Sequence, residues 1–383
     1  MNTDFMQNDL LELNHAGIYR NLKAVESPQG RKIILDGKRV LNFCSNDYLG
    51  LANDARVKRA AIEAIAEYGW GSGASRLVCG NMAPHEKLES ELALFKDTES
   101  ALVYSSGYMA NTGIIPALMG RESVVIGDKL NHASIVDGII LSRAKLMRYP
   151  HADTQALRDI LKALPASQRK LIVTDSVFSM DGDKAPLKDI VELARRYDAM
   201  VLVDEAHAFG VLGDHGKGLV EELALEGQVD IQMGTLSKAA GSFGAYACGT
   251  KVLREYLINK SRSFIYTTAM PPALAQASRA AVKIIRDEPR LRLQLKDNAD
   301  YLRAQIQGMG FDTMNSSTPI IPLLVKDPAR AKEMSNRLLQ QGIFVQAIRP
   351  PTVPSGTSRL RLTVMATHTR EDLDQLLNAL RKM

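Results

Sequence analysis

Short runs of apolar residues alternate with amphipathic helical patterns through most of the chain. The apolar runs predict strands at residues 101–104, 123–126, 170–175, 200–203, 229–235 and 244–248. Helical periodicity lies between them and is strongest at residues 55–68, 85–96 and 187–197. Continuous apolar strands joined by helices are typical of a mostly parallel sheet covered on both faces. The pattern therefore predicts an α/β fold, with residues 244–248 as an antiparallel neighbour.

The pattern changes at residues 285–300, where a charged helix follows Arg286-Asp287-Glu288-Pro289. Beyond it the predicted elements form a smaller α/β unit. It has strands near 320–325, 343–348 and 359–364, and helices near 328–341 and 370–382, the last behind the N-cap candidate Thr369. We therefore predict an N-terminal arm at residues 1–43, a large domain at 44–285 and a small C-terminal domain at 286–383.

Composition narrows the class of protein. The 383 residues are 45% hydrophobic and 24% charged, as in ordinary globular proteins, and the formal charge of +5 is not gathered into a basic arm. Nucleic acid is therefore a poor candidate partner, although a mildly positive surface suits an acidic macromolecule. No apolar run approaches the roughly 20 residues of a membrane span.

The beginning of the chain and its cysteines favour the cytoplasm. The first residues have no basic start followed by an apolar stretch, so we expect no secretory signal. Cys44, Cys79 and Cys248 are far apart, with no paired spacing that would predict a metal site. This pattern predicts free thiols in a reducing compartment and no bound metal.

Polar side chains follow directly on the ends of the predicted strands. They are His132, Ser179, Asp204, His207, Thr235 and Lys238. In open α/β sheets, ligands bind beyond the carboxyl ends of the strands. Each residue alone is equally typical of a satisfied core histidine, a helix cap or a solvated lysine. Their agreement predicts one common crevice.

Lys238 is the residue around which this crevice is organised. It ends the segment Thr235-Leu236-Ser237-Lys238, and glycines follow at 241 and 244. A lysine held away from water loses its proton near neutral pH and can then trap a carbonyl group. A solvated loop lysine is the alternative interpretation.

An anion site is predicted where the strand at 101–104 meets the next helix. The turn Ser106-Gly107-Tyr108 places unpaired N–H groups and the helix dipole toward a ligand. A phosphate and an ordinary capped helix are both compatible with this turn. The glycines of residues 69–76 match a dinucleotide motif formally, but they follow a helix and not a strand, so we reject that interpretation.

Two further segments carry candidate substrate contacts. The proline-stiffened loop at residues 347–361 contains Arg349, Thr352, Arg359 and Arg361, which suits a carboxylate or acyl clamp or else a rigid surface loop. Arg20 in the arm is either a surface residue or a site residue.

Three motifs carry a resemblance that covers nearly the whole chain from residue 43. Thr235-Leu-Ser-Lys238, Asp204-Glu-Ala-His207 and Asn131-His-Ala-Ser134 resemble the α-oxoamine synthases, which are fold-type-I pyridoxal-phosphate enzymes. The resemblance implies a large, mostly parallel sheet domain with helices on both faces, a small C-terminal α/β domain and a homodimer. Residues 347–363 are most similar to the members of the biotin pathway. Those enzymes condense L-alanine with a pimeloyl thioester and release CO₂, and the thioester is carried by coenzyme A or by an acyl carrier protein.

The resemblance also implies roles for individual residues. Lys238 would bind pyridoxal 5′-phosphate and move the Cα proton, and Asp204 would face the ring nitrogen. His207 and Ser179 would contact the ring oxygen, and His132 would stack on the ring. The phosphate would be bound by Gly107, Tyr108 and Thr235, with Thr267 or Thr268 reaching it from a second subunit. Arg20, His132 and Thr352 would contact substrate, and one of Arg349, Arg359 and Arg361 would bind the amino-acid carboxylate.

Other functions compete with this hypothesis. A glycine C-acetyltransferase or another α-oxoamine synthase would use the same cofactor groups, and an aminotransferase would release no CO₂. From a different class, the chain could be a non-catalytic regulator that binds pyridoxal phosphate. That interpretation would require the lysine to be missing or a DNA-binding segment to be appended. Lys238 is present, and we see no such segment in the sequence.

Overall fold

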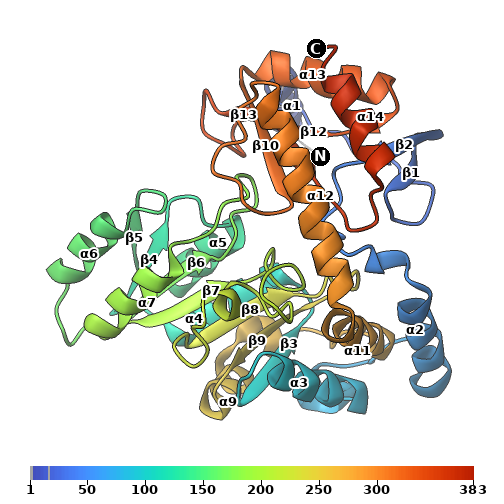
Figure 1. The fold of residues 1–383 in the computed structure, drawn as a ribbon. Coiled ribbons are helices and arrows are strands. Elements are labelled where there is room, and N and C mark those ends of the chain that lie inside the picture. Colours follow the sequence, from blue (N-terminus) through green and yellow to red (C-terminus); the bar gives the residue numbers. More distant parts are fainter. Residues whose placement is uncertain (1–2, 16–17) are drawn as a thin grey trace.

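A sheet of seven strands forms the centre of the computed structural model, which describes residues 3–15 and 18–383 (Figure 1). Its strand order is β3-β9-β8-β7-β6-β4-β5. The bounds are β3 Ser100–Tyr104, β4 Val124–Asp128, β5 Lys145–Tyr149, β6 Lys170–Asp175, β7 Met200–Asp204, β8 Ile231–Thr235 and β9 Ala245–Gly249. Strands β5, β4, β6, β7 and β8 pair in parallel, and β9 runs antiparallel to both of its neighbours. The predicted mostly parallel sheet is confirmed, including its antiparallel strand.

Both faces of this sheet are buried, which explains its continuous apolar strands. In β7, Val201 and Val203 belong to one hydrophobic core, while Leu202 between them belongs to the other. The first core is covered by α3 (Ala83–Phe95), α6 (Thr154–Ala163), α7 (Leu187–Arg196) and α11 (Pro272–Asp287). The second is covered by α4 (Gly107–Leu118), α5 (Ala133–Ser142), α9 (Lys251–Lys260) and α10 (Arg262–Ile265).

The pattern of apolar runs does not predict the edge strand β5. Its sequence is Lys-Leu-Met-Arg-Tyr, and in this strand only Tyr149 is buried. An edge strand pairs on one side only and tolerates charged residues, so it lacks the apolar run that marks the central strands.

The C-terminal part of the chain forms a second, smaller sheet. Strands β10 (Ile320–Lys326), β13 (Ser358–Thr363) and β12 (Gln346–Ile348) are antiparallel. Helices α12 (Pro289–Gly308), α13 (Pro328–Gln340) and α14 (Arg370–Leu380) accompany them, and Thr369 caps α14 as predicted. The predicted strand at 343–348 is divided, because residues 343–344 form β11 (Ile343–Phe344) in a different sheet.

That third sheet joins the N-terminal arm to the C-terminal part. Strands β1 (Lys32–Leu35) and β2 (Lys38–Asn42) form a hairpin, and β2 pairs in parallel with β11. Asp36 and Gly37 at the turn have positive φ angles of 47° and 75°, as a tight hairpin turn requires. Residues 32–42 therefore lie beside residues more than 300 positions later in the chain (Figure 1). The predicted domain limits at residues 43/44 and 285/286 remain predictions.

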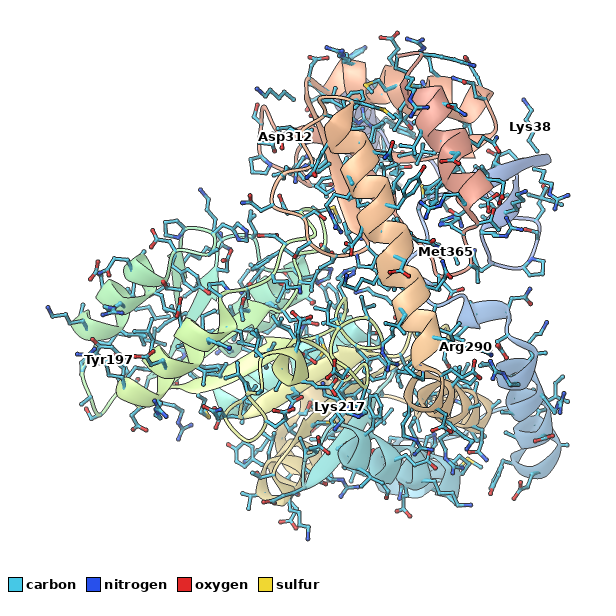
Figure 2. The ribbon with its side chains drawn as sticks, in the orientation of Figure 1. Lys38, Tyr197, Lys217, Arg290, Asp312 and Met365 are labelled. Carbon is cyan, nitrogen blue, oxygen red and sulfur yellow. The ribbon has the colours of Figure 1, made fainter. Side chains whose placement is uncertain are left out.

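The remaining elements connect these sheets. They are α1 (Asp4–His15), the short turns η1 (Leu51–Asn53) and η2 (Arg76–Gly80), α2 (Ala55–Tyr68), which packs on α11, and α8 (Leu219–Glu222). In Figure 2, Tyr197 marks the end of α7 at the far side of the large sheet, whereas Asp312 and Met365 lie in the C-terminal part. Across residues 3–15 and 18–383, no helix is long and apolar enough to cross a membrane.

Candidate active site

The carboxyl ends of the parallel strands place the predicted site residues at one edge of the large sheet. In the register, Asp175 at the end of β6 lies beside Asp204 at the end of β7, and Asp204 lies beside Met233 in β8. Thr235 ends β8, and Lys238 follows three residues later. The strand order therefore brings together carboxylates and an amine that are far apart in the sequence.

Asp204 is a buried carboxylate with fixed hydrogen-bond partners. Its Oδ1 accepts from the backbone N–H of Ala206 at 2.9 Å, and its Oδ2 accepts from Asn111 Nδ2 at 2.9 Å. Asn111 comes from α4 and also donates to Ser134 Oγ at 3.0 Å. The carboxylate is thus held from two directions, and its orientation is set before any ligand binds.

Lys238 lies close enough to these carboxylates for its proton affinity to respond to them. Burial lowers the pKa of its amine to about 8, although the charges of Asp204 and Asp175 act in the opposite direction. Because of this lowered pKa, the amine is available in its neutral, nucleophilic form near physiological pH. The loop after Lys238 packs closely on Leu51 and Ala52, since a side chain at Gly241 would clash with their backbone.

His132 caps α5 and faces the same carboxylates. Its backbone N–H donates to Asp175 Oδ2 at 2.8 Å, and its Nδ1 lies 2.8 Å from Ser134 Oγ. Burial and the charge of Lys238 lower the pKa of His132, while Asp204 raises it. Burial and the charge of Asp204 raise the pKa of Asp175 well above its ordinary value. His132 is therefore neutral at physiological pH and can lie against an aromatic ring without carrying a charge.

His207 lies at the same edge and contacts a residue of the segment after β2. Its Nδ1 is 2.6 Å from the hydroxyl of Tyr48. Burial, together with the charges of Lys238 and Arg361, lowers the pKa of His207 well below its ordinary value. The imidazole is therefore neutral, with one nitrogen bonded to Tyr48.

The predicted anion site is formed by the start of α4. Ser106 is the N-cap, and its Oγ accepts from Met109 N at 3.2 Å, which leaves the first helical N–H groups available. A side chain at Gly107 would contact Thr235 at 3.9 Å, so the helix start and the end of β8 face each other. Tyr108 extends from the same turn and bonds to Asp137. Gly107, Tyr108 and Thr235 are thus neighbours, as an anion cradle requires.

The arginines of the C-terminal loop differ in their partners. Arg359 is buried and forms an ion pair with Asp181 at 2.6 Å. Arg361 is also buried, but within the described part of the chain its guanidinium donates only to neutral oxygens: the Ser179 carbonyl, Thr363 Oγ1 and Asn46 Oδ1. A buried cation without an anionic partner is costly, so Arg361 is the better candidate for binding a carboxylate. Arg349 is half-buried in the same loop.

Ser179 is connected to this site through its backbone. Its carbonyl accepts from Arg361 Nε at 2.6 Å, and its side chain is half-buried. It therefore lies between the end of β6 and the strand that carries the arginines.

The remaining predicted residues are not brought against Lys238 by this single chain. Arg20 and Thr352 are exposed, Thr268 is exposed and Thr267 is half-buried. The loop with both threonines is fixed to residues 69–76 by bonds from Ala269 N to the Ala74 carbonyl and from Ser72 Oγ to the Met270 carbonyl. Arg20, Thr268 and Thr352 are therefore accessible to solvent, whereas Thr267 lines a small cavity beside Arg76 and Tyr104.

Sequence reasoning assigned no role to Tyr48, Asn46 and Asn111. Tyr48 and Asn46 lie in a segment that carries the family resemblance, and Asn111 stands one helical turn after Gly107. Their partners come from 93 to 315 positions away, so no local pattern could link them to the site.

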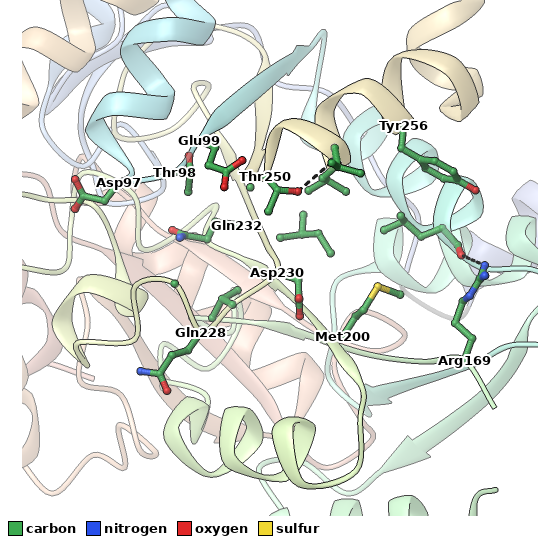
Figure 3. A pocket seen from close by; sticks show the side chains of 17 residues that line it. Asp97, Thr98, Glu99, Arg169, Met200, Gln228, Asp230, Gln232, Thr250 and Tyr256 are labelled. Carbon is green, nitrogen blue, oxygen red and sulfur yellow. Dashed lines mark hydrogen bonds between the residues drawn. The ribbon is translucent and has the colours of Figure 1, made fainter. Parts of the chain in front are cut away.

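A large cavity lies elsewhere, at the amino ends of the strands (Figure 3). Its volume is about 680 Å³, and Met200, Asp230 and Thr250 line it. Its acidic groups are engaged locally, since Asp230 accepts from Val201 N and Glu99 accepts from Lys251 N. Cavity size therefore does not identify the site, whereas the position of the reactive groups does. Within the described residues, no group of three His, Cys, Asp or Glu residues could hold a metal ion.

Comparison with known proteins identifies the family. The model of aminotransferase class I and II matches residues 38–380. An 8-amino-7-oxononanoate synthase of Geobacter sulfurreducens is 51% identical over 98% of this chain and 96% of its own length. The enzyme of that name from Symbiobacterium thermophilum is 49% identical over 100% of this chain and 97% of its own length. The chain belongs to the 8-amino-7-oxononanoate synthase family.

Solved structures agree with this family and with the fold. A serine palmitoyltransferase (SPT) from Sphingomonas wittichii has a TM-score of 0.94 at 31% identity, covering 99% of this chain and 96% of its own. A high-resolution structure of SPT with PLP has a TM-score of 0.94 at 33% identity, with the same coverage. An 8-amino-7-oxononanoate synthase from Francisella tularensis has a TM-score of 0.79 at 30% identity, covering 90% and 97%. The predicted fold-type-I architecture is confirmed.

Proposed function

We propose that this protein is an acyltransferase that condenses L-alanine with a pimeloyl thioester. The products are 8-amino-7-oxononanoate, CO₂ and the free thiol carrier, and the reaction belongs to biotin biosynthesis. The observation that carries the proposal is a low-pKa amine at Lys238, after β8, near a buried guanidinium at Arg361 on β13 that has no anionic partner among residues 3–15 and 18–383. The choice of reaction within the family follows the names of relatives about half identical to this chain.

The cofactor is pyridoxal 5′-phosphate, and the residues at this edge fit it. The N–H groups at the start of α4, beside Thr235, suit the phosphate, and Asp204 suits a protonated pyridine nitrogen. His132 and His207, both neutral, suit a ring face and a ring oxygen. When bound, the cofactor supplies an aldehyde that captures the substrate amine and a ring that accepts electrons from Cα.

The side chains of this protein then perform the positioning and the proton transfer. Arg361 binds the carboxylate of L-alanine, because its planar fork matches that group and no protein anion competes for it. Lys238, whose pKa of about 8 leaves part of the amine neutral near physiological pH, accepts the proton from Cα and later returns it. Asp204, fixed by Asn111 and Ala206, supplies the negative charge that keeps the ring cationic. Holding the carboxylate in one orientation decides which bond at Cα breaks.

We propose a homodimer in which each chain completes the site of the other. Apolar side chains of residues 70–78 and of the loop before Thr267 are exposed, including Trp70 (68%), Val78 (78%) and Tyr266 (72%), and such a surface is typical of an interface. Thr267 or Thr268 would reach the phosphate of the partner, and Arg20 and Thr352 would contact the acyl substrate. Sedimentation analysis that finds only a monomer at working concentration would contradict this part of the proposal.

The carrier of the acyl group and the location are also proposals. A net charge of +5 supports an acidic acyl carrier protein as a partner, with coenzyme A as the alternative carrier. Cys44, Cys79 and Cys248 are all unpaired, which supports a reducing cytoplasm.

A CO₂-release assay tests the proposed function directly. The purified protein is offered L-alanine, glycine or L-serine, each with pimeloyl or acetyl thioesters on both carriers. We expect release with L-alanine plus a pimeloyl thioester. Product from glycine plus an acetyl thioester alone would identify a glycine C-acetyltransferase instead. Keto-acid turnover without CO₂ would identify an aminotransferase.

A further inference from the structure

Tyr48 is a buried tyrosine that lies beside two groups of the proposed site. It follows β2, and its side chain is 1% exposed. Its hydroxyl lies 2.6 Å from His207 Nδ1, within the range of a strong O–H···N bond. Arg361 lies close enough for its charge to lower the pKa of this phenol, against the larger effect of burial. The phenol therefore contacts the imidazole expected at the ring oxygen and lies near the arginine expected at the substrate carboxylate.

The donors and acceptors around this phenol can be counted. A neutral phenol has one proton to donate, and the acceptors around it decide where that proton goes. Two acceptors are within reach: His207 Nδ1 at 2.6 Å and Asn46 Oδ1 at 3.4 Å. The amide oxygen already accepts from Arg361 Nη2 at 3.1 Å. The shorter, unshared contact to the imidazole is therefore the one that takes the proton.

Charge states at neutral pH agree with this count. Burial raises the pKa of Tyr48 to about 12, so the phenol keeps its proton. Burial, with the charges of Lys238 and Arg361, lowers the pKa of His207 well below its ordinary value, so the ring carries one proton only. If that proton were on Nδ1, it would face the phenol oxygen, and the phenol proton would be left with the 3.4 Å contact to Asn46 Oδ1, an atom that already accepts from Arg361. The arrangement with the proton on Nε2 avoids this conflict.

We propose that Tyr48 is a positioning residue that donates a hydrogen bond to His207 Nδ1 and thereby holds the imidazole as the Nε2–H tautomer. His207 then presents a fixed N–H donor on its far side, which suits the oxygen of the cofactor ring. That use of the donor rests on the proposed function, whereas the tautomer itself does not.

The tautomer can be read directly by ¹⁵N NMR of the protein labelled in its histidine rings, in the solid state and at neutral pH. The signals of His207 are assigned by subtracting the spectrum of a His207→Asn variant. The protein is measured both without cofactor and loaded with pyridoxal 5′-phosphate. We expect one unprotonated Nδ1 and one protonated Nε2 in both samples. A protonated Nδ1, or two protonated nitrogens, in the unsubstituted protein overturns the proposal without any variant of Tyr48.

The Tyr48→Phe variant tests whether the hydroxyl is the cause. Phenylalanine keeps the buried ring and removes only the donor, so we expect His207 to give a mixture of tautomers. A variant that folds and keeps the single Nε2–H form overturns the proposal. The control is Tyr301→Phe, which removes a hydroxyl bonded to Asp374 at 2.5 Å in the C-terminal part and leaves the His207 signals unchanged.

Kinetics separate this role from a merely structural one. In Tyr48→Phe we expect kcat to fall roughly tenfold, the effect of one misplaced hydrogen bond, while the KM for L-alanine changes less than kcat. An unchanged kcat in a variant with mixed tautomers would overturn the assigned use of the donor. If the tautomer is as expected but no condensation occurs with any thioester, the result contradicts the proposed function of the protein. It does not contradict the positioning role of Tyr48.

Discussion

The cofactor side of the site and the substrate side are built in different ways. On the cofactor side, Asp204, Asn111 and His207 are buried and His132 is exposed, but each of the four has hydrogen-bond partners within the chain. On the substrate side, Arg20 and Thr352 are exposed. One chain therefore fixes the groups that perform the chemistry, and it leaves open the groups that would choose the acyl donor.

The two arginines of β13 show the same contrast at closer range. Arg359 and Arg361 stand on the same strand and both are buried, but among the residues that the structure describes only Arg359 has an anionic partner, Asp181. The ion pair of Arg359 makes it part of the structure, whereas the neutral partners of Arg361 leave its charge for a ligand. Because both residues are buried arginines, the hydrogen-bond partners of each guanidinium decide its role.

The largest effect is expected on the cofactor side, at Lys238. Replacing Lys238 by alanine removes the amine that binds the cofactor and moves the proton, so turnover falls by roughly 10³-fold or more. The visible absorbance of the cofactor-bound lysine also disappears, which a spectrum of the purified variant measures. In the unsubstituted protein without cofactor, the rate of aldehyde capture should rise with pH through a midpoint of about 8. A Lys238→Ala variant with unaltered turnover would refute the assignment of the amine.

The arginine pair gives the second largest effect. Arg361→Lys loses the planar fork, and we expect kcat/KM for L-alanine to fall roughly 10- to 100-fold with little loss of stability. Arg359→Leu leaves Asp181 buried without its partner, so we expect a loss of about 3–5 kcal/mol in the free energy of unfolding. Steady-state kinetics and urea denaturation of both variants measure the two effects. The opposite assignment, with Arg359→Leu changing only the KM for alanine, would reverse our reading of the pair.

A smaller effect is expected from the exposed substrate side. Arg20→Ala should raise the KM for the pimeloyl thioester roughly tenfold, the effect of one charge-assisted hydrogen bond, and leave the KM for L-alanine unchanged. The matched control is Arg39→Ala, an exposed arginine of the β2 hairpin, which should change neither constant. Equal kinetics for the two variants would remove Arg20 from the proposed acyl site.

The smallest effect concerns stability near the end of β4. His151 lies between Asp128 at 3.1 Å and Asp183 at 2.7 Å. Burial alone would lower its pKa, but the hydrogen bonds to the two carboxylates outweigh burial and raise the pKa from 6.5 to about 10. The ion pairs therefore contribute fully below pH 6.5, and their contribution disappears as pH rises through about 10.

We expect His151→Gln to lower the free energy of unfolding by about 1–2 kcal/mol at neutral pH, a value reduced for partial exposure. The difference from the unsubstituted protein should shrink toward pH 10 in denaturation experiments at several pH values. His215→Gln is the control, because its exposed pair with Glu221 should contribute little. A difference that grows with pH would contradict the sign of this linkage.

Much of the fold follows from local patterns. The central strands bury both faces, so their apolar runs mark β6, β7 and β8, and helix α2 begins and ends where its periodicity predicts. The edge strand β5 lacked such a run because only Tyr149 is buried. The division of residues 343–348 between two sheets had no local signal, since β11 pairs with a strand some 300 residues earlier.

The sequence by itself determined which reactive side chains lie at the ends of the strands. Asp204, Thr235 and Lys238 follow apolar runs, and parallel strands must deliver their carboxyl ends to a single edge. Only the tertiary structure decided which arginine is free of an anionic partner and which phenol meets His207. Those answers depend on contacts between Asp181 and Arg359 and between Tyr48 and His207, 178 and 159 positions apart. Side-chain partners across such separations are set by how the sheets pack, and no periodicity along the chain records them.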